Sequence, residues 1–124
     1  MPRILIVDDA PIFLLLLSKL LAGEGYEVAT AKNGEEALRI LQTASFDLLL
    51  SDMNMEPVNG IELLRAARPA YPNMQVIMVT AYETLYTSGE AEKNGAFAYI
   101  TKPFKNAMLF ETVRRALAPS GATA

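Results

Sequence analysis

The stretch FDLLLSDMNMEP, residues 46–57, decides the fold because its character changes halfway along. Residues 47–51 centre on three consecutive leucines, as in a strand that is buried on both faces of a sheet. Asp52 stands where this apolar run stops, and a loop with Pro57 and Gly60 follows. The pattern predicts a core strand that brings a carboxylate to the edge of the hydrophobic core.

Similar apolar runs recur along the chain and alternate with helical patterns. We predict strands at 4–7, 26–31, 47–51, 75–80 and 98–101, and helices at 11–22, from 34, at 61–67, 82–93 and 105–118. Pro69 is expected to end the third helix. Five strands alternating with five helices are typical of an α/β fold, a doubly wound five-stranded parallel sheet. We expect one domain over residues 1–118, and a flexible tail or the start of a linker over 119–124.

Composition excludes several classes of function. The 124 residues are 52% hydrophobic and 20% charged, as expected for one compact domain. The chain has no histidine and no cysteine, which excludes histidine general bases, disulfides and imidazole or thiolate metal sites. A net charge of −3 argues against a nucleic-acid surface, and the apolar run at 12–17 is too short to cross a membrane. With no signal peptide at its start, we expect a cytoplasmic protein.

Polar side chains follow four of the predicted strands. Asp8 and Asp9 follow the first strand, Asp52 ends the third, Thr80 ends the fourth and Lys102 follows the fifth. In open α/β sheets, ligands bind at the carboxyl ends of the strands. We therefore predict that three carboxylates, a hydroxyl and an ammonium group gather at one edge.

These groups suit phosphoryl chemistry. Three close carboxylates repel one another, and Mg²⁺, which prefers oxygen ligands, relieves that repulsion. Lys102 supplies a point charge for a phosphate and Thr80 a hydroxyl donor. A carboxylate can itself accept a phosphoryl group, which gives an aspartyl phosphate. Each residue alone has an ordinary explanation, such as a helix cap, a turn or a solvated lysine, but their joint placement favours a site.

The motifs ILIVDDAP, LLLSDMNMEPVNG, VIMVTAY and AYITKPF together resemble the response-regulator receiver domain of two-component signalling. The resemblance covers nearly the whole chain and implies a flavodoxin-like fold. It implies that Asp52 is the phosphoacceptor and that Asp9, Asp52 and the Asn54 carbonyl bind Mg²⁺, with Asp8 reaching the metal through water. It also implies that Lys102 and Thr80 hold the phosphate.

The same resemblance implies how such a domain signals. It would be a switch with autophosphorylation and autodephosphorylation chemistry only, not a turnover enzyme. Tyr99 stands at the position of the switch aromatic, and the Lys102–Pro103 bond would be cis. The phosphoryl donor would be a histidine kinase or a histidine phosphotransfer protein. Output would pass through the fourth helix, fifth strand and fifth helix to a downstream protein or a missing output domain, from a monomer or weak homodimer.

The first helix carries an unusual run, IFLLLLSKLL. Helical spacing predicts a core stripe of Phe13, Leu16, Leu17, Leu20 and Leu21. Leu14 and Leu15 then fall outside the stripe, on the face that receiver domains turn toward the kinase. We favour the interpretation that they form an apolar patch that docks the helices of the kinase or phosphotransfer protein. The alternative is that they have no function, since scattered exposed leucines are common.

Two departures and two rival functions complete the prediction. Glu56 stands where many receivers have proline, which leaves the loop shape open, and Tyr82 stands where an acidic or small residue is common.

An aspartate-nucleophile phosphatase of the haloacid dehalogenase type needs an acid where this chain has Asn54, so it is disfavoured. A phosphate-independent interaction module would be indicated by loss of an acidic residue or the lysine, and all are present.

Overall fold

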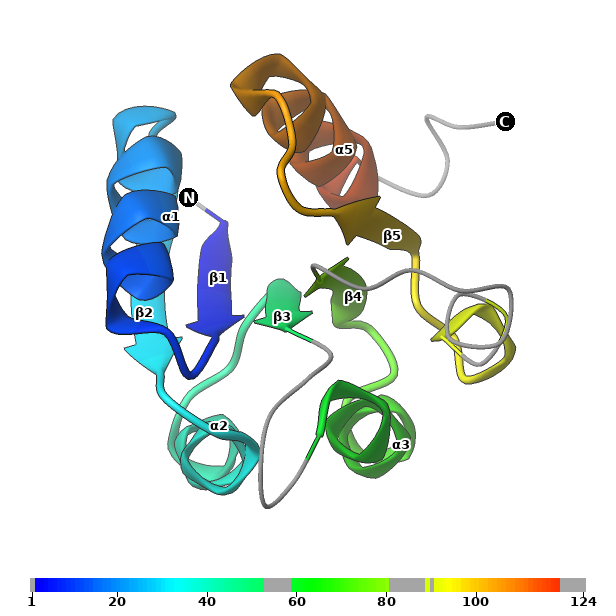
Figure 1. Ribbon diagram of the computed structural model, residues 1–124. Coiled ribbons are helices and arrows are strands. Elements are labelled where there is room, and N and C mark those ends of the chain that lie inside the picture. Colours follow the sequence, from blue (N-terminus) through cyan, green and yellow to red (C-terminus); the bar gives the residue numbers. More distant parts are fainter. Residues whose placement is uncertain (1, 53–58, 81–88, 90, 119–124) are drawn as a thin grey trace.

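The protein folds into one five-stranded parallel sheet between two layers of helices (Figure 1). The structure is a computed structural model, and it describes residues 2–52, 59–80, 89 and 91–118. The strand order is β2-β1-β3-β4-β5, which confirms the predicted doubly wound sheet. The elements are β1 (Arg3–Val7), α1 (Pro11–Gly23), β2 (Glu27–Ala31), α2 (Gly34–Thr43), β3 (Leu48–Asp52), α3 (Gly60–Ala70), β4 (Gln75–Thr80), β5 (Ala98–Thr101) and α5 (Asn106–Leu117).

Helices cover both faces of the sheet. Helices α1 and α5 lie on one face, and α2 and α3 lie on the other (Figure 1). Residues 89 and 91–93 are helical, in the C-terminal part of the helix predicted at 82–93, and the remainder of that helix lies outside the described residues. Within the described part of the chain, no helix is long and apolar enough to cross a membrane.

The strands are apolar throughout because each of their faces meets a separate core. Successive side chains of a strand point to opposite faces, so one strand supplies both cores. The core beneath α1 and α5 includes Ile4, Ile6, Leu17, Leu21, Leu48, Leu50, Ile77, Leu109 and Val113. The core beneath α2 and α3 includes Leu5, Val7, Leu41, Leu49, Leu63, Leu64, Val76 and Met78.

The strand register aligns the carboxyl ends of the central strands. Val7 pairs with Ser51, so the residues that follow them, Asp8 and Asp52, emerge at the same level. Asp52 is the last residue of β3, one position beyond the strand predicted from the sequence. The predicted convergence of strand ends is therefore confirmed by the pairing itself.

Helix α1 packs differently from the stripe predicted for it. Leu16 was expected in the core but is 44% exposed, and Leu14 was expected on the surface but is half-buried against the core of α1 and α5. The buried stripe is centred on Leu17, and at about 100° per residue Leu14 lies closer to that centre than Leu16 does. Leu15 is 58% exposed, as predicted.

Helix α3 also extends beyond its predicted end. It begins with a capping box in which Asn59 and Glu62 satisfy each other's backbone N–H groups. It runs to Ala70 with Pro69 inside it, so the prediction that this proline ends the helix was wrong. A proline in the last turn removes only one hydrogen bond, and the Arg68 guanidinium holds the turn by donating to the carbonyl of Met74 at 2.6 Å.

Candidate functional site at the carboxyl edge of the sheet

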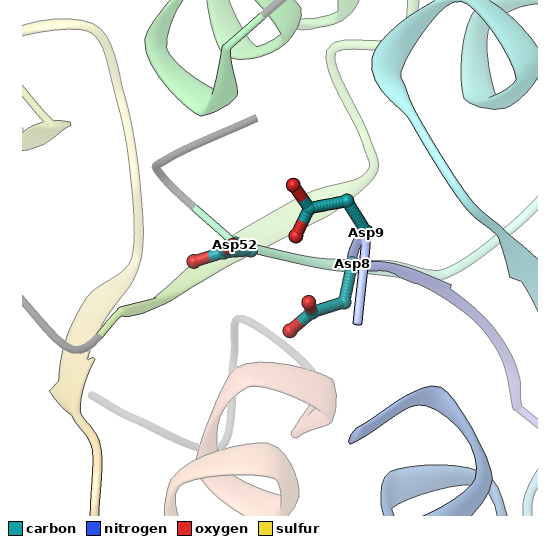
Figure 2. Close-up of side chains that lie close together, drawn as sticks. All are labelled: Asp8, Asp9 and Asp52. Carbon is teal, nitrogen blue, oxygen red and sulfur yellow. The ribbon is translucent and has the colours of Figure 1, made fainter. Parts of the chain in front are cut away.

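Three aspartates meet at the carboxyl edge of the sheet. One carboxylate oxygen from each of Asp8, Asp9 and Asp52 lies within 4.8 Å of the others (Figure 2). Asp8 is 2% exposed and Asp52 is 7% exposed, whereas Asp9 is exposed to solvent. Strands β1 and β3 are neighbours in the sheet, so their ends place these acids side by side.

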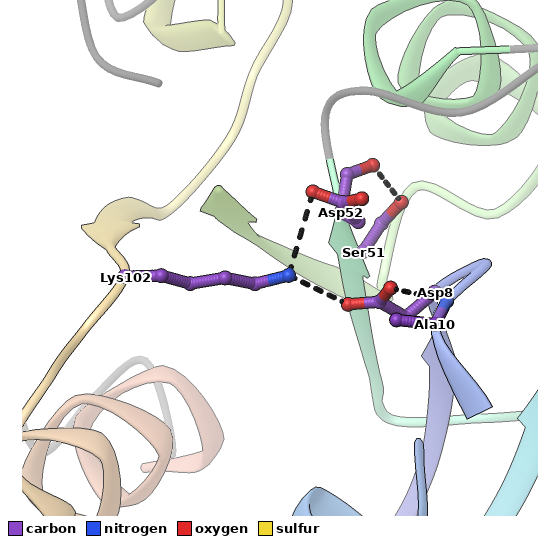
Figure 3. Close-up of polar contacts among 5 residues, drawn as sticks. All are labelled: Asp8, Ala10, Ser51, Asp52 and Lys102. Atoms are coloured by element: carbon purple, nitrogen blue, oxygen red, sulfur yellow. Dashed lines mark hydrogen bonds and ion pairs between the residues drawn. The ribbon is translucent and has the colours of Figure 1, made fainter. Parts of the chain in front are cut away.

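A lysine that follows the edge strand β5 offsets part of this negative charge. The Nζ of Lys102 lies 2.8 Å from Asp8 Oδ2 and 3.8 Å from Asp52 Oδ1 (Figure 3). The Lys102 side chain is only 14% exposed, so the ammonium and the two carboxylates interact with little solvent between them. Burying the carboxylates without this cation would be costly.

Backbone contacts hold the two buried acids in place. Asp8 Oδ1 accepts a hydrogen bond from the N–H of Ala10 at 2.9 Å, which forms a local turn before α1. The N-cap of α1 is Ala10 and has no side-chain cap hydrogen bond, so Asp8 is not the helix cap of its ordinary explanation. The hydroxyl of Ser51 donates to the carbonyl of Asp52 at 2.9 Å (Figure 3). Asp8 thus makes a local contact and a long-range ion pair at the same time.

The other predicted site residues fall at different depths. Thr80 is fully buried at the end of β4, and its carbonyl accepts a hydrogen bond of 2.6 Å from the N–H of Lys102. Tyr99 is half-buried on β5 and packs against the core of α2 and α3. The Lys102–Pro103 bond is cis, as the resemblance implied. Asn54, Glu56 and Tyr82 lie outside the described residues.

Sequence reasoning missed one residue at the site. The ring of Phe13, in the first turn of α1, lies under Lys102, with Nζ 4.0 Å from the ring centroid. The same ring meets Phe104 edge-on, at 6.0 Å between centroids and 74° between planes. The spacing of the apolar residues placed Phe13 in the core stripe. The sequence feature that could have indicated a place at the site is its position four residues after Asp9.

The donor set fits a hard divalent cation. Three carboxylate oxygens within 4.8 Å of one another, with no nitrogen or sulfur ligand, match the preference of Mg²⁺ for oxygen. Mg²⁺ usually retains several waters, and the exposure of Asp9 leaves one side of the cluster open to them. Asp8, Asp9 and Asp52 are thus the described residues that could hold the ion.

A doubly wound parallel sheet with acids from β1 and β3 and a lysine after β5 defines the class of receiver domains. The sequence model of the response regulator receiver domain matches residues 4–114. The chain belongs to this family, and it is a receiver domain of a two-component response regulator. Receiver domains act as signalling switches that interact with histidine kinases and output domains.

Similar proteins are known by sequence. The transcriptional regulatory protein GlrR of Escherichia coli K12 is 37% identical over 118 residues, which are 95% of this chain and 27% of GlrR. The transcriptional regulatory protein ZraR of Klebsiella oxytoca is 41% identical over 93% of this chain and 26% of ZraR. The chain therefore spans about a quarter of the length of these relatives.

Solved structures agree with this assignment. A CheY-like receiver domain protein of Methanospirillum hungatei JF-1 matches with a TM-score of 0.91 and 38% identity, over 94% of both chains. The response regulator TrrA of Thermotoga maritima, solved in complex with Mg(2+)-BeF, matches with a TM-score of 0.86 and 36% identity. That match covers 94% of this chain and all of TrrA.

Proposed function

We propose that this receiver domain accepts a phosphoryl group from a phosphohistidine onto Asp52, and that the modified aspartate switches its interactions with partners. The observation that carries the proposal is the placement of Asp52. Its carboxylate ends a buried strand, lies within 4.8 Å of two further acids and has the Lys102 ammonium at 3.8 Å. That is the charge arrangement needed to bring a phosphate to a carboxylate.

In the proposed reaction, a carboxylate oxygen of Asp52 attacks the phosphorus of the donor. The bond from phosphorus to the histidine nitrogen breaks, and its electron pair and a proton remain with the imidazole of the donor. Lys102, at 3.8 Å, neutralises negative charge on the transferred group, and the hydroxyl of Thr80 donates to it. Mg²⁺ bound by Asp8, Asp9, Asp52 and the Asn54 carbonyl would supply further positive charge to the phosphate oxygens.

The charge balance of the site supports a bound cation. Among the described residues, the cation that pairs with this cluster is Lys102, through Asp8 and Asp52, so one positive charge stands against three carboxylates at the edge of the sheet. The Mg(2+)-BeF complex of TrrA, at 36% identity and a matching fold, supports the same proposal by similarity. We propose Mg²⁺ as the resident ion.

We propose that the switch passes from the phosphate to Thr80 and then to Tyr99, and leaves through the helix at 82–93, β5 and α5. Thr80 and Thr101 pair in the sheet, and Tyr99 lies two residues before Thr101 on β5. We propose that output passes to a downstream protein or a further domain; the relative GlrR, of which this chain matches 27%, is a transcriptional regulatory protein. We further propose that residues 1–118 form the domain and that 119–124 are a tail or the start of a linker. We propose that the protein is a monomer or a weak homodimer.

Incubation with Mg²⁺ and acetyl phosphate tests the central step. Intact-protein mass spectrometry should detect one phosphoryl adduct, which EDTA prevents and which hydroxylamine removes as expected for an acyl phosphate. Asp52→Asn should form no adduct, whereas Asp47→Asn, an acid before the opposite end of the same strand, should react normally. No adduct on the wild type would favour a phosphate-independent module, and an adduct on Asp52→Asn would place the acceptor elsewhere.

A further inference from the structure

The Phe13 ring contacts the Lys102 ammonium, and core packing alone does not require such a contact. We propose that Phe13 is a positioning residue, whose ring face holds the Lys102 ammonium beside Asp52 for phosphoryl transfer. This inference rests on the proposed function. It adds a residue of α1 to a site otherwise built from the ends of strands.

The geometry is that of a cation–π contact. Nζ of Lys102 lies 4.0 Å from the centroid of the Phe13 ring, well inside the distance at which an aromatic face attracts a cation. The Lys102 side chain is 14% exposed, and such contacts strengthen when the cation is shielded from water. The ammonium therefore has three attractive neighbours, namely the ring, Asp8 and Asp52.

The three neighbours differ in how they respond to a bound cation. A divalent ion held by the aspartates would offset their charge and weaken their attraction for Lys102. The Phe13 ring carries no net charge and offers no ligand to a metal, so its attraction for the ammonium persists. The ring thus keeps Lys102 at the site when Asp8 no longer does.

Both sides of the contact are anchored. The N–H of Phe13 donates to the carbonyl of Ala10 at 3.0 Å in the first turn of α1, and its half-buried ring packs against the core of α1 and α5. The edge-on contact with Phe104 ties the ring to the segment that follows Lys102. The lysine is held in turn by its backbone bond to Thr80.

Two substitutions of Phe13 separate positioning from packing, because one keeps an apolar side chain without a ring and the other keeps the ring. Phe13→Leu should slow phosphorylation by acetyl phosphate about three- to thirtyfold, whereas Phe13→Tyr, which keeps the ring face, should react within about twofold of wild type. Tyr26→Leu is the matched control, because Tyr26 is a half-buried aromatic in the same core but precedes the amino end of β2. It should react at the wild-type rate.

Two further measurements show whether Phe13 acts through Lys102. In a Lys102→Met background, Phe13→Leu should cause no further slowing, because the group that the ring positions is gone. In NMR spectra of the metal-free protein, the ε-methylene protons of Lys102 should be shifted upfield by the ring. That shift should survive in Phe13→Tyr and vanish in Phe13→Leu.

The outcomes separate this inference from the proposed function. A wild type that forms no adduct overturns the proposed function, whatever the NMR spectra show. An adduct that Phe13→Leu forms at the wild-type rate overturns the positioning role and leaves the function intact. An absent upfield shift in the wild type, or equal slowing in the Lys102→Met background, also overturns it, since Phe13 would then act through packing alone.

Discussion

The ammonium of Lys102 forms an ion pair of 2.8 Å with the carboxylate of Asp8, a residue 94 positions earlier in the chain (Figure 3). The lysine is thus closer to this acid than to the proposed phosphoacceptor, which lies at 3.8 Å. A cation bound by the aspartates would compete with the lysine for Asp8. We therefore expect metal affinity and lysine position to be coupled.

Removing the lysine should strengthen metal binding and slow phosphorylation at the same time. In Lys102→Met the aspartates lose their internal counter-charge, so Mg²⁺ affinity should rise by about 1 kcal/mol, or roughly fivefold. Titration calorimetry with Mg²⁺ measures the affinity, and the acetyl phosphate reaction measures the rate. Weaker Mg²⁺ binding in the variant would contradict the competition that the 2.8 Å ion pair implies.

The two acids that follow β1 should differ in their effect on stability. Asp8→Asn removes the closer carboxylate partner of Lys102, which keeps Asp52 at 3.8 Å, and should lower the free energy of unfolding in EDTA by about 1–3 kcal/mol. Asp9→Asn removes one of three clustered negative charges at an exposed position, so the metal-free protein should become no less stable, and slightly more so.

Urea unfolding with and without Mg²⁺ tests both variants. The wild type should gain stability from Mg²⁺, because an ion that binds only the folded state stabilises it, and both variants should lose most of that gain. Equal destabilisation by Asp8→Asn and Asp9→Asn in EDTA would show that the ion pair with Lys102 contributes little to stability.

The exposed face of α1 should affect transfer from a protein donor alone. Leu15 is 58% exposed, so Leu15→Arg should leave the stability and the acetyl phosphate reaction unchanged, within about 0.5 kcal/mol for unfolding. With a phosphorylated histidine kinase or phosphotransfer domain that phosphorylates the wild type, transfer should fall severalfold. Equal transfer to Leu15→Arg and to the wild type would show that Leu15 is not part of the surface that contacts the donor protein.

Leu14 gives the contrasting case on the same helix. It is half-buried against the core of α1 and α5, so Leu14→Arg should destabilise the fold. Phosphorylation by acetyl phosphate and by the donor protein should then slow together. Thermal unfolding measured beside the two reactions distinguishes this outcome from a surface effect.

The cap of α3 should contribute to stability independently of the site. Asn59→Ala removes the side-chain acceptor of the capping box and should lower the free energy of unfolding by about 1 kcal/mol. Asn59→Asp keeps an acceptor at the cap and should retain most of the stability. Circular dichroism in urea measures both, and a loss as large in Asn59→Asp as in Asn59→Ala would contradict the cap explanation.

Much of this architecture could be predicted from local pattern. Runs such as Ile4–Val7 and Leu48–Leu50 are apolar at every position, and that pattern indicates strands covered on both faces. The alternation of strands and helices then leaves a parallel sheet, whose carboxyl edge gathers Asp8, Asp52 and Lys102.

Some local patterns failed where packing outweighed them. Pro69 predicts a helix end, yet α3 continues through it to Ala70. The buried side chains of Leu63, Leu64 and Ala67 hold the helix against the core, and Arg68 in the last turn donates to the carbonyl of Met74. The leucines of α1 are identical in type, so composition could not separate Leu14 from Leu16. Their exposure depends on how the helix is rotated about its axis against the sheet.

The sequence by itself determined the class of fold and the set of charged groups at the site, because uniformly apolar runs indicate buried strands and their alternation with helices indicates a parallel sheet. Only the tertiary structure decided the pairing within that set. Lys102 binds Asp8 more closely than Asp52, and its ammonium rests on the ring of Phe13. Those contacts depend on the distance from β5 across β4 to β3 and on how α1 packs against the sheet. No single stretch of sequence specifies either of these.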